Sequence, residues 1–142
     1  MTVIPLENVT RGVCEWLDAQ GFAVFRPDTP YVAGERAVTF RALPKAPVEA
    51  VSVNLYGVDD DLTLPSTTIS VQLRFRAASE ETVNVWADQV ASSLHMRHGL
   101  KMGDLVVQRA VRTIVAPLGV DENGRVERAD SYDLLLMRSS AL

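Results

Sequence analysis

A near-perfect alternation of apolar and polar side chains in TTISVQLRFR, residues 67–76, constrains the fold more than any other feature. The apolar members fall on one side: Ile69, Val71, Leu73 and Phe75. The opposite side is polar and ends in Gln72, Arg74 and Arg76. A period of two predicts a β-strand with one face in the core and the other directed outward.

Similar patterns predict further strands along the chain. They cover 22–26, 36–43, 49–56, 104–115 and 128–138, with a turn region at 117–125 before the last. The runs 36–43, 49–56 and 67–76 follow one another with short Pro- and Gly-containing connections. We expect them to form an antiparallel meander, because a parallel pair would need a crossover of a dozen or more residues.

Two segments carry helical periodicity. In residues 5–21 an apolar stripe follows Pro5, which suits a first helical position, and Gly21 suits the residue just past the end. Residues 78–99 have a second stripe, with Ser79 as an N-cap and Gly99 as the end.

The element order α, β, β, β, β, α, β, β predicts one α+β domain spanning residues 1–142. We expect an antiparallel-dominated sheet flanked by the two helices, with a long C-terminal β hairpin. A content of 47% hydrophobic and 23% charged residues fits a globular core of this size.

Charge and targeting features narrow the function. A formal net charge of −4 argues against attachment to nucleic acid or an anionic membrane, because both depend on a basic surface. No signal peptide or membrane-spanning run is visible, and the single Cys14 has no partner for a disulfide. These features predict a cytosolic protein without a membrane role.

Catalytic and metal-binding constellations are thin. Cys14 with His95 or His98 could serve as nucleophile and base, but Cys14 lies beside an apolar stripe, as a core residue would. His95, His98 and Asp104 could hold zinc, yet histidines near a helix end are favoured by the dipole alone. We expect no enzymatic activity, no cofactor and no metal.

Arginines on the predicted strands are the remaining lead. Together with Gln72 they are Arg74, Arg76, Arg109, Arg112, Arg125 and Arg128. Their side chains could belong to an ordinary solvent-facing sheet. They could equally form a subunit or ring-forming interface, because acids of a neighbouring copy can answer them.

Two short signatures resemble the tail terminator proteins of long-tailed, non-contractile bacteriophages, also labelled minor capsid or tail completion proteins. One is VQLRFR at residues 71–76, leading into the second helix. The other is GRVERADSY at residues 124–132, in the closing hairpin. The resemblance covers residues 5–138.

The resemblance implies a structural virion protein that assembles in the host cytoplasm. Such proteins form a homo-hexameric ring on the tail tube protein, stop tube polymerisation and present the head-tail joining surface to a connector protein. The genome DNA passes through without specific binding. On this reading the seven polar residues named above lie at subunit or tube interfaces, and Tyr132 matches a patterned position.

The triplet Asp59, Asp60 and Asp61 is a candidate luminal loop in such a ring, although an outer, solvated turn is the alternative. Two other functions stay open. A neck or head-completion connector protein would share the ring but bind the portal side. A cytosolic small-ligand-binding α+β domain would instead carry a deep apolar pocket with a few polar groups.

Overall fold

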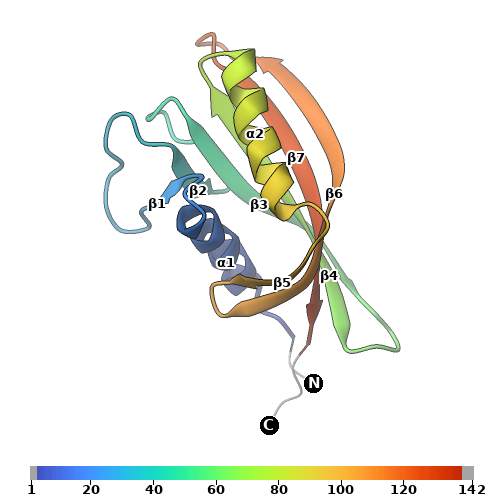
Figure 1. Cartoon of the computed structure of the whole chain (residues 1–142). Helices are drawn as coiled ribbons and strands as arrows, with labels where there is room; N and C mark the ends of the chain where they lie inside the picture. The colour runs from blue at the N-terminus through green and yellow to red at the C-terminus, as the bar shows by residue number, and fades with distance from the viewer. Residues whose placement is uncertain (1–2, 139–142) are drawn as a thin grey trace.

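The computed structural model describes residues 3–138, in which two helices lie on the same face of a seven-stranded sheet (Figure 1). The elements in chain order are α1 (Leu6–Ala19), β1 (Val24–Phe25), β2 (Ala37–Phe40), β3 (Ala50–Asp60), β4 (Ser66–Ala77), α2 (Glu80–Leu94), β5 (Arg97–Met102), β6 (Leu105–Val120) and β7 (Val126–Met137). Across the sheet the strands follow the order β1-β2-β3-β4-β7-β6-β5. The predicted α+β class, the two helices and the long C-terminal hairpin, β6–β7, are confirmed.

The core lies between the helices and one face of the sheet. The alternating apolar side chains of β4 are all buried there, as the sequence predicts. Phe75 meets Trp86 of α2 edge-on, with ring centroids 5.1 Å apart. Full burial of side chains of this size contributes roughly 1.5–3 kcal/mol each. The indole Nε1 of Trp86 also donates to the carbonyl of Phe22 at 3.0 Å, which ties α2 to the chain leaving α1.

Two helix ends carry the signals expected from their sequences, whereas Pro5 is the N-cap of α1 and not its first helical residue. The Ser79 hydroxyl accepts a hydrogen bond from the amide of Thr82 at 3.2 Å, which confirms Ser79 as the N-cap of α2. Glu80 and Glu81 occupy the first turn, where the helix dipole favours negative charge. Gly21, with φ +79°, follows α1 in the left-handed conformation predicted for its end.

The sheet is mixed, which corrects the expected antiparallel-dominated sheet and its meander. β1 pairs with β2 in parallel, and β2 pairs with β3 in parallel; β3, β4, β7, β6 and β5 then pair antiparallel. The meander prediction is therefore wrong for β2 and β3 and right only for β3 and β4.

The parallel pair depends on a short crossover held by arginines. Residues 41–49 return the chain to the starting end of β3. The guanidinium of Arg76 donates to the carbonyls of Val48 at 2.9 Å and Pro47 at 2.7 Å, and Arg125 donates to Lys45 at 2.7 Å. Arg76 alternates with Phe75, so it holds this segment against the face of the sheet that the helices leave open. A crossover between parallel strands usually contains a helix that packs on the sheet. Here a helix-free segment is held on the sheet by hydrogen bonds from arginine side chains.

β5 is absent from the sequence prediction, which extends the second helix to Gly99. α2 ends at Leu94 because His95 is extended and Met96 adopts φ +62°. Gly99 has φ +64° but lies inside β5, so it does not end the helix. β6 likewise runs to Val120, through the first part of the predicted turn at 117–125.

α1 and the end of β5 approach closely at Gly12. A Cβ on Gly12 would lie 2.6 Å from the carbonyl oxygen of Met102, a distance that real contacts do not show. Glycine in a helix normally costs stability relative to alanine. Here the missing side chain lets the β5–β6 hairpin pack against the helix.

We therefore expect Gly12→Ala to lower the free energy of unfolding by about 1–3 kcal/mol, as overpacked core substitutions do. Denaturant unfolding of the purified protein measures this. Gly57→Ala is the matched control, because its added Cβ would meet only Ser70 atoms at an ordinary 3.4 Å. A stabilising effect of Gly12→Ala, typical of an open helix, would contradict the close approach.

Candidate assembly surfaces

The outward face of β4 keeps its polar character in the folded chain. Gln72 is half-buried between Asn54 of β3 and Ser131 of β7, which are its register partners. Arg74 is exposed, and its Nε lies 2.6 Å from Oε1 of Glu127. The Arg74 side chain is 46% exposed and stays accessible to a partner, whereas that of Glu127 is only 11% exposed.

Arg128 lies on the inner face of the sheet, beneath α2. Its Nε and Nη2 donate to the two carboxylate oxygens of Asp130 at 2.8 and 3.0 Å, which makes the pair bidentate. Nη2 also donates to Asp88 at 2.8 Å, and Nη1 donates to Asn84 at 3.2 Å. The Arg128 side chain is 7% exposed and that of Asp130 is 0% exposed. This guanidinium is satisfied within its own chain and joins α2 to β7.

Arg112 of β6 extends toward the same acids with looser geometry. Its Nη1 lies 3.6 Å from Asp130 Oδ2 and 3.9 Å from Asp88 Oδ1. Within residues 3–138, neither this Nη1 nor the buried hydroxyl of Tyr132 has a hydrogen-bond partner. Burial, together with the charge of Asp130, raises the pKa of Tyr132, so its hydroxyl stays neutral.

The remaining arginines divide into two kinds. Arg76 and Arg125 hold the crossover 41–49, as described above. Burial lowers the pKa of Arg76, and the nearby Arg125 adds to this effect. Arg109 is exposed on β6, and no hydrogen bond or ion pair of its side chain occurs among residues 3–138. The interface role expected for all seven polar residues stays a prediction, strongest for Arg74 and Arg109.

The acidic triplet lies at the end of β3 and start of the following turn. Asp61 Oδ1 accepts from the amides of Leu64 at 2.7 Å and Thr63 at 2.8 Å, which lowers the pKa of Asp61. Asp60 accepts from Thr67 at 2.6 Å and from Arg138, which lowers its pKa as well. Asp59 is exposed. A luminal position for the triplet stays a prediction.

Exposed apolar side chains along two strands were not foreseen. In the C-terminal half of β6 they are Ile114, Val115, Leu118 and Val120, with exposed fractions of 42–68%. In the C-terminal half of β3 they are Tyr56, which is 56% exposed, and Val58, which is 49% exposed. The signal was present in IVAPLGV, residues 114–120, but its Pro and Gly favoured a turn.

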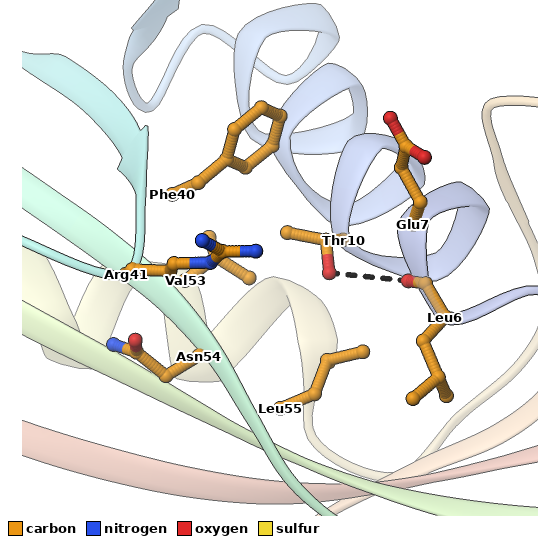
Figure 2. Close-up of a pocket in the computed structure, with 8 residues that line it drawn as sticks. All are labelled: Leu6, Glu7, Thr10, Phe40, Arg41, Val53, Asn54 and Leu55. Carbon is orange, nitrogen blue, oxygen red and sulfur yellow. Dashed lines mark hydrogen bonds between the residues drawn. The ribbon is translucent and has the colours of Figure 1, made fainter.

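A surface groove of about 710 Å³ lies between α1 and β3. Figure 2 shows Leu6 of α1 and Leu55 of β3 extending toward each other at one end of it, and Phe40 and Arg41 lie at the other end. β2 pairs with β3 only as far as Val53, so the edge of β3 beyond that residue borders the groove. It is an open trough and not the enclosed apolar pocket that a small-ligand-binding domain would carry.

Of the catalytic and metal candidates, Cys14 and His95 have structural surroundings, and His98 and Asp104 are exposed. Cys14 has no exposed surface, and burial raises the pKa of its thiol to about 12. His95 Nδ1 accepts from the backbone amide of Arg112 at 2.9 Å. In residues 3–138, no three His, Cys, Asp or Glu side chains gather around a common point, and no helix has the length and apolarity to cross a membrane.

Arg128→Met should lower the free energy of unfolding by about 1.5–3 kcal/mol, because the buried Asp130 loses two charged hydrogen bonds and keeps only Arg112, 3.6 Å away, as a countercharge. Arg109→Met on β6 is the control, because Arg109 is exposed and its side chain makes no ion pair within residues 3–138, so its change should stay below about 0.5 kcal/mol. Chemical denaturation of both variants measures the difference. Equal, small effects would show that Asp130 is not held by Arg128.

Comparison with known proteins places this fold. A chain from the virion of a native gene transfer agent particle is similar in structure, with a TM-score of 0.51 at 14% sequence identity, over 70% of this chain and 78% of that chain. At this identity the likeness concerns the fold. Curated proteins give no significant match. Residues 16–137 match the description "Bacteriophage tail terminator protein". The chain belongs to the bacteriophage tail terminator family.

Proposed function

We propose that this protein forms a ring that caps the phage tail tube, ends tube polymerisation and provides the surface for head-tail joining. The family match over residues 16–137 carries the proposal. The role is structural, and the copies act together as one assembly in the virion tail.

Several features support assembly from many copies. The exposed apolar side chains of β3 and β6 lie on the parts of these strands that continue past the last pairs with β2 and β5, which end at Val53 and Ala110. A molecule with two different apolar surfaces of this kind can form head-to-tail contacts between copies. Such contacts close into a ring when a whole number of the rotations that relate neighbouring copies makes a full turn. Arg74 and Arg109 supply charged groups for contacts with a neighbour or the tube.

The family resemblance supports three finer details of the proposal. We propose six copies per ring, with the tail tube protein on one side and a head-tail connector protein on the other. The negative net charge suits a conduit, because a wall that does not hold phosphates lets the genome DNA pass.

Removing the protein from an assembling phage tests the proposal. We expect tubes of irregular, extended length without attached heads, because nothing stops polymerisation and the joining surface is absent. Electron microscopy of lysates measures tube length, and expression of the wild-type chain should restore uniform tails.

Uniform tubes that merely lack heads would contradict tube termination and identify a neck protein instead. Normal, infectious particles would exclude both roles.

A further inference from the structure

The edge of β6 that faces away from β7 has a short stretch without a neighbouring strand. β5 covers β6 as far as Ala110, and His95 then takes the backbone amide of Arg112. At the other end, Pro117 has no N–H to offer. Residues 113–116 therefore present unpaired backbone groups at the border of the sheet, where Figure 1 shows no strand beyond the upper part of β6.

The outer side of β3 opens in the same way. The last contact with the β2 segment is the amide of Arg41, which donates to the carbonyl of Val53 at 3.0 Å. β2 pairs with β3 only as far as Val53, so residues 54–60 have no strand on that side among residues 3–138. This stretch borders the groove beneath α1 (Figure 2).

We propose that residues 113–116 of β6 in one copy pair antiparallel with residues 54–57 of β3 in the next copy, joining the sheets of neighbouring subunits. The occupant of the groove border is thus a second copy of this chain. The inference rests on the proposed ring and specifies how its subunits meet.

Strand direction supports this pairing. Three successive antiparallel pairs separate β3 from β6, namely β3–β4, β4–β7 and β7–β6, so β3 and β6 run in opposite directions within one subunit. Rotation about a ring axis preserves the up and down sense of each copy. β6 of one copy must then meet β3 of the next in antiparallel orientation, whose hydrogen bonds are perpendicular to the strands.

One register matches the side chains as well. Leu55 shares a face with its partner Val71, and Val115 shares the same inner face with Asp130. Placing Leu55 opposite Val115 brings two apolar side chains together on the inner face, and Tyr56 lies at the β-bulge that directly follows Leu55. A shift of one residue would turn one set to the opposite face.

The positions of charged side chains also favour the antiparallel orientation. Beyond the paired stretch, β3 continues to the exposed Asp59, and β6 leads back toward Arg109 and the start of β5 at Arg97. Both arginines are exposed, and their side chains make no ion pair within residues 3–138. An acid of one copy therefore approaches unpaired arginines of the next, which favours this orientation.

A pair of cysteines tests the register. In Leu55→Cys/Val115→Cys, the two positions lie directly opposite, with Cα atoms about 5.5 Å apart in a hydrogen-bonded pair, a distance that suits a disulfide. We expect oxidation of the assembled protein to give reducible multimers up to the size of the ring on denaturing gels. The native Cys14 is fully buried and stays unreactive.

Two controls share the same chemistry. Val58→Cys/Val115→Cys displaces one position by three residues, about 10 Å along the strand, and should give no multimers. Val115→Cys alone should give none either; dimers from it would reveal two-fold pairing of β6 with itself and overturn the proposal.

Light scattering, and electron microscopy with tail tubes, separate failure of the interface from failure of the function. Rings that form with the double cysteine variant but give no cross-link would refute this pairing and leave the proposed function standing. Failure of the wild-type chain to form rings, both in solution and on tubes, would refute the function and the pairing together.

A second substitution does not depend on disulfide geometry. Ile114→Arg should raise the concentration needed for assembly about tenfold or more, because a charge would be buried against the neighbour. Val106→Arg is the matched control on the same strand, since Val106 is 54% exposed, Ile114 is 56% exposed, and Val106 lies beside β5. Equal assembly of both variants would overturn the proposal.

Discussion

The difference in length between strands and helices dominates this structure. A β-strand advances about 3.3 Å per residue and an α-helix only 1.5 Å. β6 has 16 residues and α2 has 15, so the strand is roughly 50 Å long and the helix about 22 Å. Two helices on one face cannot cover such strands. The C-terminal halves of β3 and β6 extend past the core, and several of their apolar side chains are exposed.

Much of this architecture could be predicted from local pattern. The alternation in residues 67–76 identified β4 and its buried face, and Ser79 identified the start of α2. What failed depended on distant contacts. Arg76 and Arg125 donate hydrogen bonds to the crossover between the parallel strands β2 and β3, and neither arginine is near it in the sequence. β5 was hidden because the helical pattern of α2 extends to Gly99 in the sequence, whereas the left-handed backbone of Met96 ends the helix before β5.

The arginines show why residue type alone does not assign a role. Arg74 and Arg76 stand two residues apart on the same face of one strand, yet one is exposed and the other is buried against backbone carbonyls. Arg128, on the next strand, lies on the inner face with Asp130. The sequence pattern identifies which arginines lie on strands. Only the positions of loop 41–49 and helix α2 determine which of them remain available to a partner.

The closure of the β6 border by His95 and Pro117 also bears on solubility. Segments that stack into amyloid-like fibrils usually need six or seven consecutive residues without proline. The open stretch here is residues 113–116, flanked by a proline and by an amide already in use. Such a border can accept one matching strand, but it is too short to template a growing fibril. The β6 border therefore favours pairing with one specific strand over open-ended stacking.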